Sequence, residues 1–130
     1  MNIFLEIYFV KIYKVPMTLT QAYMLLIVSI LLEITATGSL KATEGFTRWI
    51  PSLISVVAIS LCMYLMSHVM KVLPVAITYA TWSGVGIVAL TLIGIIKYKQ
   101  VPNLATIIGL ALIVIGVVIV NMMNNTNINN

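Results

Sequence analysis

The sequence predicts an all-α membrane protein with four transmembrane helices. Of its 130 residues, 62% are apolar and only 8% are charged, whereas a soluble domain averages roughly 45–50% apolar and about 25% charged residues. Too little polar surface is therefore present to cover a water-facing shell. Intrinsic disorder requires low hydrophobicity and high charge, so the same composition excludes it. The chain length corresponds to one domain.

Four long apolar stretches supply the predicted helices, and each approaches the roughly 20 residues needed to cross about 30 Å of hydrocarbon. The apolar residues run continuously and do not alternate, which favours helices over a β-barrel. Short breaks with charges or proline separate the stretches, so successive helices must be antiparallel. The predicted helices span residues 23–40, 53–69, 75–96 and 104–122.

The two ends of the chain differ from this four-helix domain, which covers residues 17–123. Residues 1–16 are apolar but too short to span a membrane. Because Pro16 ends this segment and Met17 follows it, we interpret it as an N-terminal extension upstream of a natural start at Met17. A short interfacial helix is the alternative. Residues 124–130 are rich in asparagine, and we expect them to form a disordered tail.

Glu33 is the most informative residue, because it is an acid near the middle of the first apolar stretch. An ionisable group there costs on the order of 2.5–3.5 kcal/mol, and such groups usually mark ion paths, proton relays or ligand counter-ions. Helical spacing places Ser29 and Thr37 on the same face, together with the small Ala36. We expect this stripe to point into the bundle; a satisfied structural carboxylate is the alternative.

A buried carboxyl group can hold a proton or a cation, but it holds both poorly at once. Burial disfavours its charged form, and a nearby cation favours that form. This mutual exclusion is sufficient for proton/cation exchange. It predicts a substrate that is cationic and hydrophobic enough to reach membrane depth.

Aromatic residues in the second and third apolar stretches provide matching chemistry. Tyr79, Trp82 and Ser83 lie within about one helical turn, and the faces of Tyr and Trp attract cations most strongly when desolvated. An interfacial aromatic belt is the alternative interpretation. In the second stretch, Tyr64 is a candidate pocket wall, with simple packing as the alternative.

Two pairs of glycines are candidates for helix packing and bending. Gly84 and Gly86 allow a close backbone approach, or a bend in the third helix. Gly109 and Gly116 lie seven residues apart on one stripe of the fourth helix. Because small residues let membrane helices approach closely, we interpret this stripe as a dimer contact. Packing within one protomer is the alternative.

Other classes of function find no support in the sequence. It contains no CxxC, HExxH or P-loop pattern, and its one histidine and three acids are too scattered for a metal site. No nucleophile–base pair is apparent. The seven lysines and arginines lie mostly between apolar stretches, which favours a membrane surface over nucleic acid. We therefore expect no enzyme, no metal, no other cofactor and no nucleic-acid partner.

These motifs resemble those of the small multidrug resistance family of bacterial exporters, from Met17 to about Asn121. The matching motifs are the lone Glu33, LKATEGFTRWIPS from Leu40, ITYATWSGVGI from Ile77 and IIGLALIVIGVVIVN from Ile107. The resemblance implies a multi-pass protein of the bacterial inner membrane that forms an antiparallel dimer. It further implies export of quaternary ammonium and other lipophilic cations in exchange for protons, by alternating access.

The resemblance also implies roles for single residues. It makes Glu33 the shared site for protons and substrate. Carried over by motif, Tyr79 and Trp82 line the pocket around the carboxylate, and Ala36 and Thr37 lie beside it. The bend region is Gly84 to Gly86, and Gly109 to Gly116 form part of the dimer contact.

Two positions favour the multidrug branch of this family. Guanidinium exporters resemble one another in carrying Trp where Ala36 stands here, and they usually have Thr in place of Ser83. The multidrug branch commonly has Gly at the position of Ala36 and often an aromatic residue at that of Ile59, so both departures bear on which cations are taken. The rival hypotheses are a guanidinium or polyamine exporter of the same fold, and a non-transporting membrane subunit that regulates a larger protein.

The distribution of basic residues bears on the orientation of the chain in the membrane. Counted over the full chain, three Lys or Arg lie on the side of the N-terminus and four on the opposite side. So weak a bias allows both orientations and hence a homodimer. With Met17 as the start the counts become one and four, which favours one orientation and a heterodimer with an oppositely oriented paralogue.

Overall fold

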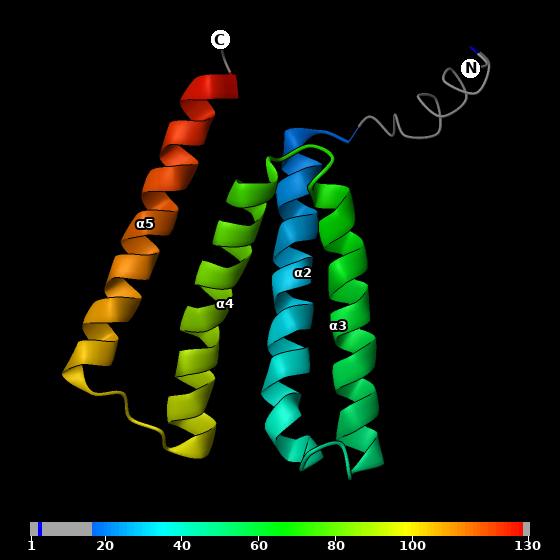
Figure 1. Ribbon diagram of the computed structural model, residues 1–130, viewed down its shortest axis with the longest axis vertical. Helices are drawn as coiled ribbons and strands as arrows, with labels where there is room; N and C mark the ends of the chain where they lie inside the picture. The colour runs from blue at the N-terminus through cyan, green and yellow to red at the C-terminus, as the bar shows by residue number, and fades with distance from the viewer. Residues whose placement is uncertain (1–2, 4–16, 129–130) are drawn as a thin grey trace.

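The computed structural model describes residue 3 and residues 17–128, so the expectation for residues 1–16 lies outside this range apart from residue 3. The described chain forms four long helices and a short 3₁₀ turn (Figure 1). These elements are α2 (Leu19–Leu40), η1 (Lys41–Thr43), α3 (Trp49–Val69), α4 (Val75–Tyr98) and α5 (Leu104–Ile128). All four long helices are long and apolar enough to cross a membrane. The prediction of an all-α, multi-pass membrane protein is confirmed.

The helices extend beyond the apolar stretches that predicted them. Helix α2 begins at Leu19 because the Thr18 side chain accepts a hydrogen bond from the Gln21 backbone, and the Gln21 side chain accepts one from the Thr18 backbone. Such a capping box satisfies N–H groups that hydropathy does not register. Helix α5 continues to Ile128, where the sequence led us to expect a disordered tail from residue 124. Once a helix has formed, each further residue adds a hydrogen bond, so it can propagate past the membrane.

The helices lie in the order α5, α4, α2, α3 across the molecule (Figure 1). Helices α2 and α3 form the closest pair, and the buried core lies between them. Its residues are Ala22, Leu26, Ile30, Cys62, Met66, Val69 and Leu73. Helix α4 packs on the other side of α2, and α5 packs against α4. Helix α2 therefore lies between two neighbours, and its middle is the position of Glu33.

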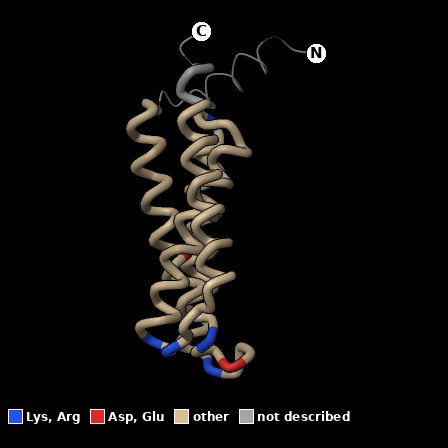
Figure 2. The backbone as a smooth tube through the Cα atoms, turned by 90° about the vertical axis from the view of Figure 1, so that its left-hand side faces the viewer, with Lys and Arg blue, Asp and Glu red and all other residues tan. Residues whose placement is uncertain are grey.

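The basic residues are concentrated at one end of the bundle (Figure 2). Within the described chain, Lys41, Arg48, Lys97 and Lys99 lie at the end that holds the α2–α3 and α4–α5 connections, and only Lys71 lies at the other. An exposed ion pair joins Arg48 to Glu44 across 3.4 Å. This end therefore carries most of the positive charge of the described helices.

Candidate functional site

The Glu33 carboxylate is half-buried between its own helix and α4. The Thr37 hydroxyl, one turn further along α2, donates a hydrogen bond to Glu33 Oε1 at 2.8 Å. The second oxygen, Oε2, faces Gly86 of α4, where an added Cβ would lie only 3.0 Å away. The absence of a side chain at Gly86 therefore makes room for the carboxylate beside the α4 backbone.

No basic side chain is paired with this carboxylate in the part of the chain that the structure describes, where the one ion pair is that between Arg48 and Glu44. An ionised carboxylate in a membrane interior is costly without a compensating charge. Among the described residues, the hydrogen bond from Thr37 is the one side-chain bond to this carboxylate. Between residues 17 and 128, no three His, Cys, Asp or Glu side chains come together to hold a metal ion.

The residues of the polar stripe expected on α2 have different hydrogen-bond partners. Ser29 is fully buried, and its hydroxyl donates to the Leu25 carbonyl of the same helix. Ala36 is also buried, and its carbonyl accepts a hydrogen bond from the Ser55 hydroxyl of α3 at 2.9 Å. Four residues advance an α-helix by about 40° beyond one full turn. Ser29 and Thr37 therefore lie on opposite flanks of Glu33, and of the residues expected beside the carboxylate only Thr37 bonds to it.

Tyr79 and Trp82 form a tilted aromatic pair on α4, with ring centroids 5.3 Å apart and an interplanar angle of 52°. Tyr79 is exposed, whereas Trp82 is half-buried against the core between α2 and α3. The Trp82 indole N–H is buried and has no partner of good hydrogen-bond geometry, but it lies beside the buried Cys62 thiol of α3, which is a weak acceptor. The pair therefore offers an aromatic face, while the Trp82 N–H has only a weak partner in the core.

The other two polar candidates have local partners. The Ser83 hydroxyl donates to the Ala80 carbonyl one turn back on α4. Tyr64 is exposed on α3, and its ring lies 4.7 Å from the imidazole of His68. In a single chain these side chains are thus engaged on their own helices, and their predicted place in a pocket stays a prediction.

The two glycine pairs differ in their surroundings. An added Cβ at Gly84 would lie 2.5 Å from Val117 Cγ2 of α5. Helix α4 is continuous from Val75 to Tyr98, so the bend at Gly84 and Gly86 stays a prediction, and both residues lie where helices approach closely. An added Cβ at Gly109 or Gly116 would meet nothing within 4 Å. Packing inside one protomer therefore does not account for the second pair.

Asn121 and Thr81 form a contact that the sequence analysis missed. Asn121 Nδ2 on α5 donates to Thr81 Oγ1 on α4 at 2.8 Å, and to the Val117 carbonyl at 2.8 Å. Polar side chains join membrane helices in this way. The sequence does contain an indication of this contact, because Asn121 is a polar residue at the end of an apolar stretch and comes one turn after Val117.

A small cavity of about 110 Å³ opens between α2 and α3 next to the site. Its lining includes Thr37, which bonds to Glu33, and Ser55 and Ile59 of α3. Ile59 is the position at which the sequence departs from the aromatic residue expected of the multidrug branch. Ile59 and Thr37 thus line the same cavity, although Glu33 itself does not.

Comparisons with known proteins show a family relationship. A family model described as Small Multidrug Resistance protein matches residues 21–113. The quaternary ammonium compound-resistance protein QacC of Staphylococcus sp. (strain ST827) is 42% identical over 105 residues, covering 81% of this chain and 98% of QacC. QacG of Staphylococcus sp. (strain ST94) is 44% identical over the same shares. The multidrug resistance protein EbrA of Bacillus licheniformis is 39% identical over 100 residues, covering 77% of this chain and 95% of EbrA.

Proposed function

Because the chain belongs to the small multidrug resistance family, we propose that it exports quaternary ammonium and other lipophilic cations in exchange for protons. The names of its relatives state resistance to quaternary ammonium compounds and to multiple drugs. The observation that carries the proposal is the Glu33 carboxylate, which lies at membrane depth without a basic partner in the described chain. It is a transporter, with neither enzymatic chemistry nor a cofactor.

Competition at Glu33 couples the two fluxes. A protonated carboxyl group is neutral and has no charge with which to hold a cation, whereas a cation stabilises the ionised form. The hydrogen bond from Thr37 fixes Oε1, and Gly86 leaves room in front of Oε2. A cation on one side of the membrane therefore displaces the proton, and protons on the acidic side displace the cation. Alternating access then turns this exclusion into exchange.

Tyr79 and Trp82 supply the aromatic part of the substrate site. Their tilted arrangement presents π faces, and attraction between a desolvated cation and such a face contributes up to about 2 kcal/mol. Quaternary ammonium groups have no N–H to donate, so they rely on this attraction and on the Glu33 charge.

A second protomer completes the chamber. In the single chain, no residue in the membrane-spanning window of α5 is buried. The stripe formed by Gly109 and Gly116 has no neighbouring atoms within 4 Å of an added Cβ. A dimer formed through this stripe, with one protomer inverted, brings two Glu33 side chains into one space. They then titrate as a coupled pair and not singly. We place this dimer in the inner membrane of a bacterium.

The test is proton release when tetraphenylphosphonium is added to weakly buffered, purified protein. Wild type is expected to release protons, and Glu33→Gln, which keeps the shape of the side chain, is expected to release none. Glu44→Gln is the matched control, because Glu44 is an exposed acid in the α2–α3 connection. It should behave as wild type. Release from Glu33→Gln equal to that of wild type would contradict exchange at this carboxylate.

Guanidinium serves as the second ligand in the same assay. Release by guanidinium alone would assign the protein to the metabolic exporters of the fold. Release by neither ligand would contradict a self-sufficient transporter and favour a regulatory subunit or a missing paralogue. Co-purification from native membranes would then distinguish these two outcomes.

A further inference from the structure

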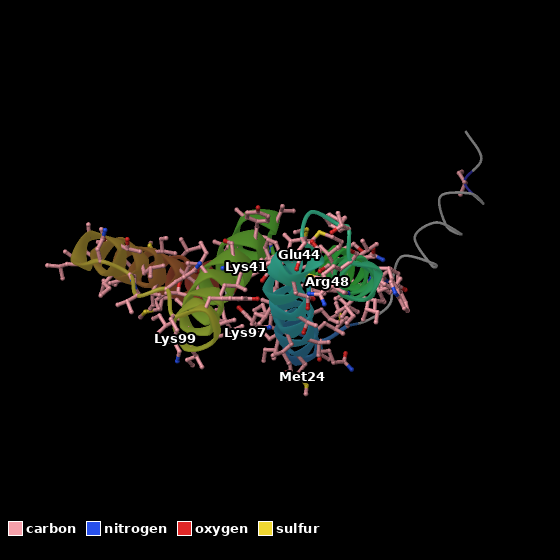
Figure 3. All side chains as sticks on the ribbon, turned by 90° about the horizontal axis from the view of Figure 1, so that it is seen from below. Met24, Lys41, Glu44, Arg48, Lys97 and Lys99 are labelled. Atoms are coloured by element: carbon pink, nitrogen blue, oxygen red, sulfur yellow. The ribbon has the colours of Figure 1, made fainter. Side chains whose placement is uncertain are left out.

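A groove lies between α2 and α4 at the basic end of the bundle. It encloses about 420 Å³, and its lining combines the apolar Ile93 and Ile96 with Gly38, Ser39 and Lys97. Seen from this end, Lys41 and Lys97 lie where α2 and α4 meet, and Lys99 lies farther from α2 (Figure 3). The groove is therefore apolar along its length and positively charged at its mouth.

Tyr98 brings the two lysines of the mouth together. Lys41 Nζ lies 4.3 Å from the centroid of the Tyr98 ring, and Lys97 Nζ lies 5.4 Å from it. The Tyr98 hydroxyl donates to the Gly38 carbonyl at 3.4 Å, which ties the ring to α2. Neither ammonium group has a carboxylate partner among the described residues, where the one ion pair is elsewhere. Two like charges thus flank one ring without neutralisation.

This groove is separate from the site around Glu33. No residue of its lining contacts the carboxylate: the bond to Glu33 comes from Thr37 and the close approach from Gly86. By helical geometry, the α2 residues that line the groove, Ile34, Thr35, Gly38 and Ser39, lie about 100–160° around α2 from Glu33. A ligand in the groove therefore contacts a different flank of α2 from the one that carries the carboxylate.

We propose that the groove binds one anionic phospholipid, with its phosphate on Lys97 at the mouth, within the field of the nearby Lys41 charge, and an acyl chain along Ile93 and Ile96. The charge argues for an anionic headgroup, because lysines near helix ends extend to the membrane surface, and basic pockets between membrane helices bind such groups. The apolar walls argue for a lipid and against free phosphate, which would gain nothing from them.

The test is native mass spectrometry of the purified protein with palmitoyl-oleoyl phosphatidylglycerol, beside the phosphatidylcholine with the same chains. We expect phosphatidylglycerol to bind more tightly. A lysine near an anionic lipid surface contributes about fivefold in affinity, so Lys97→Gln and Lys41→Gln should each weaken phosphatidylglycerol binding about fivefold. Lys99→Gln is the matched control, since it removes the same charge at the same end from a position that neither lines the groove nor lies beside Lys97 on the Tyr98 ring, as Lys41 does.

Three results would overturn this proposal. Equal losses in Lys97→Gln and Lys99→Gln would mean diffuse attraction to the surface and no site. Equal binding of inorganic phosphate would mean a free anion. Ser39→Trp fills the groove without a change of charge and should weaken the binding of both lipids. The third overturning result is a change in the fraction of dimer when Ser39→Trp is measured without lipid, because a second copy of the chain, and not a lipid, would then cover the groove.

Discussion

The glycines of α4 and those of α5 resemble one another in sequence but not in their surroundings. At Gly84 and Gly86, an added Cβ would lie 2.5 Å from Val117 and 3.0 Å from the Glu33 carboxylate. At Gly109 and Gly116 it would meet nothing within 4 Å. Small residues in membrane helices allow close contact with another helix. The α4 pair makes this contact inside the protomer, and the α5 pair is left open for one outside it.

The helices differ in the same way, since some are packed inside the protomer and one is exposed. Helices α2 and α3 contribute the buried core, and α4 adds the aromatic pair that lies near it. Helix α5 has no buried residue in its membrane-spanning window and is held to α4 by Val117 and Asn121. Three helices thus build the site, and the fourth presents a surface. Substituting each glycine separately tests this difference between the helices.

The largest expected effect is the loss of the dimer in Gly116→Leu. Overpacking a close contact costs about 1–3 kcal/mol, and a dimer contains the substitution twice, so we expect dissociation to increase about thirtyfold or more. Stability of the single protomer should change by no more than about 0.5 kcal/mol, because the site is open there. Analytical ultracentrifugation in detergent measures the monomer–dimer equilibrium.

Ala111→Leu is the control for this experiment. Ala111 is exposed on the same helix but lies away from the glycine stripe. It should dimerise as wild type. If both variants dissociate alike, the stripe has no special role, and the comparison between the two glycine pairs fails on the α5 side.

The next effect is a loss of protomer stability in Gly84→Ala. The added methyl group would lie 2.5 Å from Val117 Cγ2, and a β-branched side chain on a helix has little rotamer freedom with which to move away. We expect a loss of about 1–3 kcal/mol in the free energy of unfolding in mixed micelles. Val117→Ala removes the opposing methyl groups and should restore most of the loss. A double variant no more stable than Gly84→Ala would contradict this contact.

The sequence predicted the positions of the helices better than the contacts between them. Length and continuous hydrophobicity are properties of a single segment, so the four helices could be read directly, although the Thr18 cap extends the first beyond its apolar stretch. Which flank of a helix meets which partner depends on the whole bundle. Helical spacing placed Ser29 and Ala36 on the face of Glu33 that points into the bundle, and both are buried, but spacing could not show that Ser55 of α3 bonds to the Ala36 carbonyl. For the same reason, the sequence could name Gly84 and Gly109 but not distinguish their roles.

A smaller effect is expected from Gly86→Ala, which tests the site and not the fold. The new Cβ would lie 3.0 Å from Glu33 Oε2, and the carboxylate can shift by a few tenths of an ångström. We expect the affinity for tetraphenylphosphonium to fall by up to about tenfold, equivalent to about 1.4 kcal/mol, with little change in the unfolding free energy. Isothermal titration calorimetry measures this affinity.

Gly94→Ala is the matched control on the same helix. Its added Cβ would meet only the end of the flexible Gln100 side chain, at 3.3 Å, outside the Glu33 site. Its cation affinity should equal that of wild type. An equal loss in both variants would mean that any methyl group on α4 disturbs binding, and that the space beside Glu33 is not specific.

The smallest effect concerns the polar bond that holds α5 to α4. Asn121→Leu removes the donor to Thr81, and hydrogen bonds between membrane helices average only about 0.6 kcal/mol in double-mutant cycles. Thr81 keeps a partner after this change, because its hydroxyl already donates to the Ile77 carbonyl. We therefore expect Asn121→Leu and Thr81→Val each to lower the unfolding free energy by well under the loss in Gly84→Ala. Their double variant should show a coupling of about 0.6 kcal/mol. A coupling of zero would mean that the hydrogen bond does not help to hold α5 to α4, and that apolar packing at this junction does so without it.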